Sequence, residues 1–293
     1  MAETGLILKG VGGFYTVLND RGEEVVCRAR GRFRKDGISP VVGDRVEYLN
    51  DGEGRYVSEI LPRKNLFVRP AVANLDKLII VASLSAPKPD LLLVDKLIIC
   101  CEKHKVEPVI VLNKLDEATV GTADGIIAQY GPTGYRVITA SAATGECVEL
   151  IKAEIEDSIC CFAGQSAVGK SSLINAIVPQ LGLETGGLSR KTERGRHTTR
   201  HAQLWHVCGG AVLDTPGFSL LEAEQMEPEE LCEYYREMKG KRIGCRFGEC
   251  LHRSEPDCAV KPLIASGELS KERYERYLTI LDELIEKRKH RYD

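Results

Sequence analysis

The sequence of 293 residues predicts a multidomain α/β chain with three parts. Short strand-like runs separated by turn residues fill the N-terminal part. Apolar strand-like runs alternate with helical stretches around a glycine-rich turn in the centre, and cysteines gather near the C-terminus. We predict a β-barrel at residues 1–64, an α/β domain with a parallel sheet at 65–220, and a helical metal-binding module at 221–293.

Composition describes a globular protein, with 43% hydrophobic and 28% charged residues. The longest apolar runs, such as residues 78–84, are too short to cross a membrane, and residues 1–10 do not resemble a signal peptide. These features predict a cytoplasmic protein without a membrane partner. The net charge is −3, but basic residues cluster at 28–35, 190–200 and 287–291, so we expect one side to face a polyanion.

The N-terminal part contains five strand-like runs, at residues 6–9, 14–18, 24–28, 44–49 and 55–60. Five short strands suit a small barrel of the oligonucleotide-binding (OB) type. Arginines occupy alternate positions from Arg28 to Arg34, so they would share one face of an extended strand and could follow a phosphate backbone. The alternative is a barrel that serves only as a spacer. Residues 62–70 are predicted to be a linker.

The central part alternates buried strands with helices. Strand-like runs at 75–84, 108–112 and 135–139 are separated or followed by helical stretches at 91–104 and 146–155. This alternation predicts a parallel sheet covered on both faces. Ligands of such sheets bind where the strands end, so the residues after each strand are the candidate site.

The stretch Gly164 to Ser172 is the strongest of these candidates. It reads G-Q-S-A-V-G-K-S-S and joins the apolar run 159–163 to the helical run 173–177, as in a phosphate loop. Lys170 would reach the β and γ phosphates, and the Ser171 hydroxyl would hold Mg²⁺. The candidate nucleotide-binding residues are Gly164, Gln165, Ser166, Ala167, Val168, Gly169, Lys170, Ser171 and Ser172. The alternative is a glycine turn that binds nothing.

Two further loops predict recognition of guanine. Asn113, Lys114, Leu115 and Asp116 follow the strand 108–112 in an N-K-x-D arrangement. The Asp116 carboxylate would accept hydrogen bonds from guanine N1–H and the 2-amino group. Adenine would leave this carboxylate unpaired, at a cost of about 1–3 kcal/mol. Asn113 would pack the loop, and Lys114 would lie over the ring.

The second guanine loop follows the strand-like run 135–139. Ser141 and Ala142 belong to an S-A loop whose backbone N–H would meet guanine O6. The alternative for these residues is an ordinary turn that caps the helix after it.

A polar segment at 182–200 and the stretch Asp214-Thr215-Pro216-Gly217 predict a nucleotide-sensing switch. Thr198 or Thr199 would complete the Mg²⁺ shell, Asp214 would hold Mg²⁺ through water, and the Gly217 N–H would meet the γ-phosphate. Phe218 stands where many GTPases place a water-positioning Gln. His197 is our candidate catalytic residue for that task, and the alternative is an inert surface histidine.

The order of these motifs is reversed relative to ordinary GTPases. N-K-L-D and S-A precede the phosphate loop, the threonines and D-T-P-G, which resembles a circularly permuted GTPase. The chain therefore leaves the α/β domain directly after D-T-P-G. From this connection we expect the C-terminal module to move with the nucleotide state.

The C-terminal module has the spacing of a metal site. Cys245, Cys250, His252 and Cys258 follow C-x4-C-x-H-x5-C, and three thiols with one imidazole can close a tetrahedral Zn²⁺ site. We predict one structural Zn²⁺ per chain; the alternative is buried cysteines without a metal. An acidic helix is predicted at 228–239 and a helix with an apolar face at 274–285.

The barrel, the permuted motifs and the stretch C-R-F-G-E-C-L-H-R-S-E-P-D-C-A-V together resemble the RsgA family of ribosome small-subunit-dependent GTPases, over nearly the whole chain. The resemblance implies a monomer that binds GTP or GDP with Mg²⁺. It also implies binding to the 30S subunit and its 16S rRNA late in maturation, hydrolysis of GTP stimulated by the subunit, and release afterwards. Two alternatives stay open: an RNA-binding structural protein with a relic nucleotide site, and a permuted GTPase of the large subunit.

Overall fold

The computed structural model describes residues 2–29, 33, 38–52, 54–68, 70–182, 202–214 and 226–290. These residues form two compact units, and each is described by itself. The first unit takes the described residues of 1–78, 149–162 and 186–218, and the second takes those of 79–148, 163–185 and 219–293. Both units therefore combine segments that lie far apart in the sequence.

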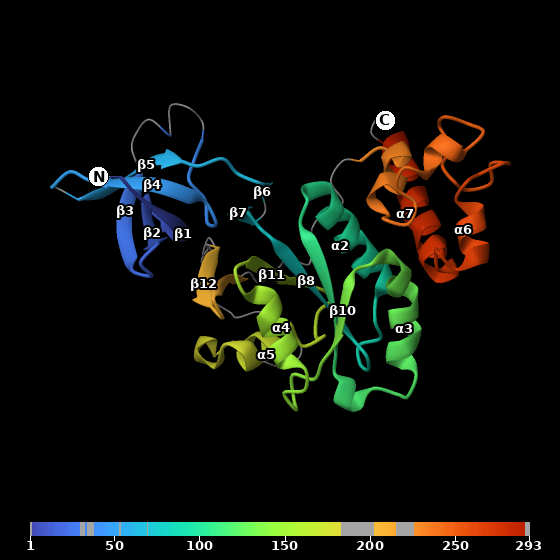
Figure 1. Cartoon of the computed structure of the whole chain (residues 1–293), viewed down its shortest axis with the longest axis horizontal. Coiled ribbons are helices and arrows are strands. Elements are labelled where there is room, and N and C mark those ends of the chain that lie inside the picture. Colours follow the sequence, from blue (N-terminus) through green and yellow to red (C-terminus); the bar gives the residue numbers. More distant parts are fainter. Residues whose placement is uncertain are drawn as a thin grey trace. The chain divides into compact units, whose positions relative to one another are not determined.

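A closed β-barrel forms the N-terminal part of the first unit (Figure 1). Its strands are β1 (Glu3–Val11), β2 (Phe14–Asn19), β3 (Glu24–Ala29), β4 (Arg45–Asn50) and β5 (Arg55–Ile60). They pair in the order β1-β2-β3-β5-β4, and pairing of β1 with β4 closes the barrel. Its core contains Ile7, Val17, Val25, Cys27, Phe33, Val46, Tyr48 and Val57. The predicted five-strand barrel is confirmed, with each strand close to its predicted run.

The predicted linker at 62–70 is a structured connection. Within it, β6 (Leu66–Val68) pairs antiparallel with β7 (Ala71–Ala73). Arg63 donates hydrogen bonds of 2.6 and 2.8 Å to the two carboxylate oxygens of Asp44, whose side chain is fully buried. A bidentate pair of this kind is strong and directional, so it anchors the connection to the barrel.

Three more strands and a helix complete the first unit. They are β11 (Ile159–Ala163), β12 (Gln203–Val207), β13 (Gly210–Asp214) and α4 (Val148–Ile155). Strands β11 and β13 are parallel, with Cys160 opposite Val212, and β12 is antiparallel to β13. No strand was predicted from the sequence at the position of β12.

The second unit holds the parallel strands that the central motifs follow. These are β8 (Lys77–Ser83), β9 (Glu107–Asn113) and β10 (Arg136–Thr139), in the order β10-β9-β8. Strands β9 and β10 are parallel, and every residue of β9 after Glu107 is buried, which explains its continuous apolar run. The helices of this unit are α2 (Leu91–His104), α3 (Thr122–Tyr130), α5 (Lys170–Ile177), α6 (Lys261–Ser266) and α7 (Lys271–Lys289).

Helix α2 has the predicted bounds because local signals set both of its ends. The Asp90 side chain caps the N-terminus by accepting a 2.9 Å hydrogen bond from the Leu93 N–H. Lys105 takes a left-handed conformation at the C-terminus, with φ 56° and ψ 42°, and its N–H bonds back to the last turn.

The C-terminal module is packed directly on α2. Its apolar core includes Leu231, Tyr235, Tyr277 and Leu281, and Ile99 of α2 belongs to the same core. Helices α2 and α7 are in contact, as the adjacent ribbons in Figure 1 indicate. Part of the predicted third domain therefore shares a core with the α/β domain.

A buried ionic network reinforces this packing. Arg273 of α7 is 1% exposed and bonds to two carboxylates, those of Asp95 on α2 and Glu237. Arg276 donates to the second Asp95 oxygen and, at 2.9 Å, to Gln129 of α3. Burial alone would lower the pKa of Arg273, but the carboxylates of Asp95 and Glu237 raise it above its usual value, so the guanidinium stays charged.

The predicted acidic helix at 228–239 begins where expected but is shorter and is a 3₁₀ helix. The chain forms a 3₁₀ helix at Pro228–Tyr234, after which Tyr235 is extended, with φ −106° and ψ 110°. Leu231 and Cys232 are buried, as the helical pattern predicts, but tertiary contacts hold the Tyr235 backbone in the extended conformation. Its ring packs edge-on against Tyr277, with centroids 5.2 Å apart, and the Arg273 guanidinium lies 4.8 Å from its centroid.

Among the described residues, no helix combines the length and the apolar character needed to span a membrane.

Replacing Arg273 by Ala will destabilise the second unit. The change leaves the Asp95 and Glu237 carboxylates buried without their shared partner, which costs about 3–5 kcal/mol. Urea unfolding followed by the circular dichroism of the helices measures the loss. Arg253→Ala is the matched control, because Arg253 bonds to Asp282, which lies on α7 as Arg273 does, and both side chains are about half exposed. Loss of this exposed pair will cost no more than about 1 kcal/mol. Equal midpoints for the two variants would contradict this assignment.

Candidate functional site

The phosphate loop has the predicted strand-turn-helix setting. Strand β11 leads into Gly164, and α5 begins at Lys170 with Gly169 as its N-terminal cap. Gly164, Ala167 and Gly169 have positive φ values of 135°, 64° and 95°. The turn between them comprises Gln165, Ser166, Ala167 and Val168, and Ser171 and Ser172 lie in the first turn of α5. This geometry brings backbone N–H groups and a helix N-terminus together, as anion binding requires.

Glycine is required at both ends of the loop by close approach as well as by torsion. A Cβ at Gly164 would lie 2.1 Å from the carbonyl oxygen of Val81 in β8. A Cβ at Gly169 would lie 2.3 Å from the Nδ2 of Asn113. The loop is therefore pressed against β8 and against the N-K-L-D turn, which no larger residue would allow.

The Lys170 side chain bonds back to the backbone of the phosphate loop. Its Nζ donates hydrogen bonds of 2.7 Å to the Gly164 carbonyl and 2.6 Å to the Gln165 carbonyl. Partial burial lowers the pKa of Lys170 from its usual value. Among the described residues, the partners of this ammonium are these two neutral carbonyls, and an anion at the loop would be a stronger partner.

The Asn113 side chain joins the three loops that the sequence singled out. This residue is 1% exposed. Its Nδ2 donates a 2.8 Å hydrogen bond to the Val168 carbonyl of the phosphate loop, and its Oδ1 accepts one of 3.1 Å from the Ala142 N–H of the S-A loop. Because both ends of one amide are used, the base loops and the phosphate loop have a fixed separation.

Asp116 is positioned by Ser141, which follows the neighbouring strand β10. Ser141 is fully buried, and its hydroxyl donates a 2.5 Å hydrogen bond to Asp116 Oδ1, while Asp116 itself is exposed. Lys114 has a left-handed backbone conformation, with φ 66°, and its ammonium donates a hydrogen bond to the Ala86 carbonyl. The 3₁₀ turn that contains Asp116 begins at the next residue, Leu115. The hydrogen bond from Ser141 thus fixes the direction of the Asp116 carboxylate, which remains exposed.

The switch lies largely outside the described residues. His197, Thr198, Thr199, Gly217 and Phe218 are not among them, and Asp214 is described only by its backbone, at the end of β13.

The four predicted metal ligands come together. One ligand atom from each of Cys245, Cys250, His252 and Cys258 lies within 4.8 Å of all the others, and all but Cys245 are buried. The His252 Nδ1 is 3.6 Å from Cys245 Sγ and 3.3 Å from Cys258 Sγ. Burial raises the pKa of the Cys250 thiol to about 12, and a bound cation would reverse that effect.

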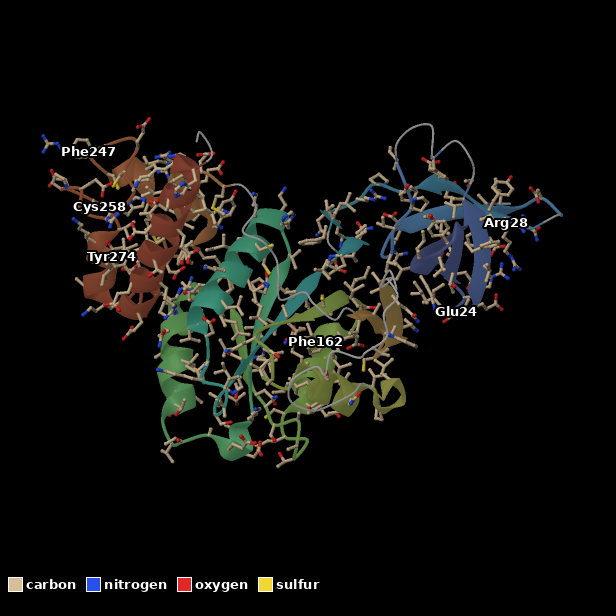
Figure 2. All side chains as sticks on the ribbon, turned by 180° about the vertical axis from the view of Figure 1, so that it is seen from behind. Glu24, Arg28, Phe162, Phe247, Cys258 and Tyr274 are labelled. Carbon is tan, nitrogen blue, oxygen red and sulfur yellow. The ribbon has the colours of Figure 1, made fainter. Side chains whose placement is uncertain are left out.

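Groups around the cluster orient it, and the sequence analysis missed them. The Tyr274 hydroxyl donates a 2.6 Å hydrogen bond to the His252 carbonyl, and the Tyr277 hydroxyl donates one of 2.9 Å to the Leu251 carbonyl. The Ala259 N–H points at Cys245 Sγ, 3.3 Å away. Figure 2 shows Cys258 and Tyr274 in the same module. Two tyrosines on an otherwise aliphatic helix face were the available signal.

Comparison with protein families agrees with this arrangement. The model described as "RsgA GTPase" matches residues 60–224, and the model described as "RsgA N-terminal domain" matches residues 4–55. The first match covers the phosphate loop, both base loops and D-T-P-G. The second falls within the barrel.

Curated and solved relatives match over almost the full length. A protein of Caldanaerobacter subterraneus named "Small ribosomal subunit biogenesis GTPase RsgA" is 48% identical over 291 residues, with 98% of each chain covered. The protein of the same name from Bacillus subtilis is 41% identical, with 98% of this chain and 99% of that protein covered.

Two solved structures share the fold. The crystal structure of YjeQ from Thermotoga maritima has a TM-score of 0.85 at 36% identity, and covers 97% of this chain and 99% of its own. The structure of YloQ, described as a circularly permuted GTPase, has a TM-score of 0.83 at 35% identity, with 98% and 96% covered. The reversed motif order, the three loops joined at Asn113 and these matches lead to one conclusion: the chain belongs to the RsgA family of circularly permuted GTPases.

Proposed function

We propose that this GTP hydrolase acts late in the assembly of the small ribosomal subunit. It binds the 30S particle and its 16S rRNA in the GTP state and leaves after hydrolysis that the particle stimulates. The observation that carries the proposal is the single Asn113 amide that spans the base loops and the phosphate loop, because it supports one continuous guanosine triphosphate site. The names of the curated relatives support the choice of the small subunit.

In this proposal the guanine base is read by residues at the ends of β9 and β10. Asp116 accepts from N1–H and the 2-amino group with its two carboxylate oxygens, and its Oδ1 also accepts from the Ser141 hydroxyl. Lys114 packs over the ring beside Leu115, and the Ala142 backbone lies near O6. Asn113 holds these groups in register.

The phosphates are held by the loop Gly164 to Ser172. Lys170 exchanges its carbonyl partners for the β and γ phosphates. The Ser171 hydroxyl at the start of α5 is the kind of oxygen ligand that Mg²⁺ takes, together with Thr198 or Thr199 and, through water, Asp214. Bound Mg²⁺ would neutralise charge on the phosphates, and the Gly217 N–H would meet the γ-phosphate.

Zinc is the metal that best fits the C-terminal cluster. Zn–S bonds of about 2.3 Å and Zn–N bonds of about 2.0 Å at a tetrahedral angle separate nitrogen from sulfur by about 3.5 Å. The separations of 3.3 and 3.6 Å around the His252 Nδ1 support this geometry. With four protein ligands no position remains for a substrate, so the metal is structural.

The barrel supplies an RNA-binding face. Phe14 is 48% exposed, and the Arg28 guanidinium lies 5.1 Å from its ring centroid. Figure 2 shows Arg28 on the barrel, on the same strand as Glu24. An exposed ring with an arginine over it suits stacking with a nucleobase. The protein works as a cytoplasmic monomer, with the subunit as its macromolecular partner.

Asp116→Ala will remove discrimination between bases. The carboxylate contributes about 1–3 kcal/mol to guanine binding, so we expect GTP affinity to fall by about 10- to 100-fold while the preference for GTP over inosine triphosphate disappears. Calorimetric titration with both nucleotides measures this. Glu117→Ala, on the same 3₁₀ turn, is the control and will keep the preference. Retained guanine preference in the Asp116 variant would contradict the assignment.

The assay that tests the function combines sedimentation with turnover. The chain will co-sediment with purified 30S subunits in the presence of a non-hydrolysable GTP analogue and less with GDP, and 30S subunits will raise GTP turnover. Binding to 50S subunits alone would favour action on the large subunit. Binding without any turnover would favour a structural RNA-binding protein.

His197→Ala will lower the stimulated turnover by at least about 100-fold with little change in GTP affinity, since a positioned water-orienting group contributes on that scale. The same turnover assay measures it. His206→Ala, an exposed histidine on β12, is the control. Full stimulated turnover in the His197 variant would remove this residue from the mechanism.

Cys250→Ser will release the metal and unfold the C-terminal module. We expect one zinc per chain by elemental analysis in the unchanged protein and a clear loss in the variant, with a lower melting temperature. Cys208→Ser is the control, because Cys208 is an exposed free cysteine outside the cluster. Full zinc content in the Cys250 variant, or zinc lost equally in both, would contradict the site.

A further inference from the structure

Strand β8 and the loop after it contact both the phosphate loop and the base-reading turn. The Val81 carbonyl oxygen of β8 would lie 2.1 Å from a Cβ at Gly164 of the phosphate loop. After the strand, the Leu84 N–H donates a 2.8 Å hydrogen bond to the carbonyl of Asn113, the residue whose side-chain amide joins the three loops. We call residues 84–87, which read L-S-A-P, the β8 loop. None of the sequence motifs includes it.

The β8 loop is shaped by the buried serine at the end of the strand. The Ser83 side chain is fully buried. Its hydroxyl accepts a 3.1 Å hydrogen bond from the Ser85 N–H and donates one of 3.3 Å to the Ala86 carbonyl. A serine that bonds to the backbone in this way forms a local turn. Ser85 and the Ala86 carbonyl therefore have defined positions relative to the end of β8.

Two side-chain contacts join the β8 loop to the turn that reads the base. The Lys114 ammonium donates a hydrogen bond to the Ala86 carbonyl. The Ser85 hydroxyl donates one of 2.5 Å to Glu117 Oε2, and Glu117 lies on the same 3₁₀ turn as Asp116. Because its acceptor is a carboxylate, the bond from Ser85 is stronger than one between neutral groups. It is the contact that fixes the β8 loop beside the turn.

We propose that the Ser85–Glu117 hydrogen bond, which we call the latch, keeps Lys114 over the guanine ring and so limits how fast the nucleotide leaves. The proposal rests on the proposed function, in which the Lys114 stem packs on that ring. A lysine has a flexible four-carbon stem, so it covers the ring only while its ammonium is held. The Ala86 carbonyl holds the ammonium, and the latch holds the Ala86 carbonyl beside the turn. Ser85 is therefore a positioning residue.

The latch acts on the residence time of the nucleotide and not on the choice of base. Guanine and hypoxanthine present the same kind of ring face, so the Lys114 stem covers both. They differ in the 2-amino group, which Asp116 reads and which inosine nucleotides lack. Loss of the latch will therefore speed the release of GDP and of inosine diphosphate by the same factor.

The experiment measures the release of a fluorescent GDP analogue from the full-length protein after excess GDP is added. We expect Ser85→Ala and Glu117→Ala each to speed release by about 5- to 10-fold, because a partly exposed hydrogen bond to a carboxylate contributes on that scale. The double variant will release no faster than either single variant, since both remove one bond. Ser85→Thr keeps the hydroxyl and will restore slow release. Thr119→Ala, which removes an exposed hydroxyl two residues after Glu117, is the control.

Further measurements separate a latch from a general loss of structure. The urea midpoint and the preference for GTP over inosine triphosphate will be unchanged in all of these variants. An unchanged release rate in Ser85→Ala, or effects that multiply in the double variant, would overturn the latch. A lost base preference in Ser85→Ala would also overturn it, because the loop would then act in base recognition.

The latch and the proposed function fail in different ways. A chain that binds no guanine nucleotide would overturn both. Nucleotide binding without any binding to 30S subunits would overturn the proposed function alone, and the release rates would still decide whether the latch operates.

Discussion

A single buried amide fixes the geometry of the nucleotide site. Asn113 ends β9, donates to Val168 and accepts from Ala142, so three loops from distant parts of the chain share one side chain. Gly169 has no Cβ because Asn113 Nδ2 occupies that space. These contacts depend on where the loops lie in space and not on the order in which the chain visits them. A permuted chain can therefore keep an ordinary GTPase site.

The C-terminal module is stabilised in two different ways. Around the metal cluster, Tyr274 and Tyr277 hold the backbone at His252 and Leu251 by their hydroxyl groups. Where the module packs on α2, the Arg273 and Arg276 guanidinium groups bond to the Asp95 carboxylate beside a shared apolar core. Such pairs require well-matched geometry, because buried charges without partners are costly. The module is therefore oriented by specific polar contacts as well as by apolar packing.

Elements with strong local signals were predictable from the sequence. Helix α2 has a capping aspartate and a helical apolar pattern, the barrel strands alternate, and the phosphate loop and metal ligands have diagnostic spacing. Tertiary contacts decided the rest. The stretch 228–239 has helical periodicity, but Tyr235 is held extended between Tyr277 and Arg273. Arg63 looked like part of a linker because its partner Asp44 lies nineteen residues earlier in the sequence. Pairings of this kind leave no periodic trace in the sequence.

Helix α7 binds α2 through Asp95 and α3 through Gln129, and these helices precede and follow β9 in the chain. Strand β9, which ends in the N-K-L-D turn, thus lies in the chain between two helices that both bond to α7. A displacement of α7 would therefore pull on the helices at both ends of β9, through Asp95 on one side and Gln129 on the other.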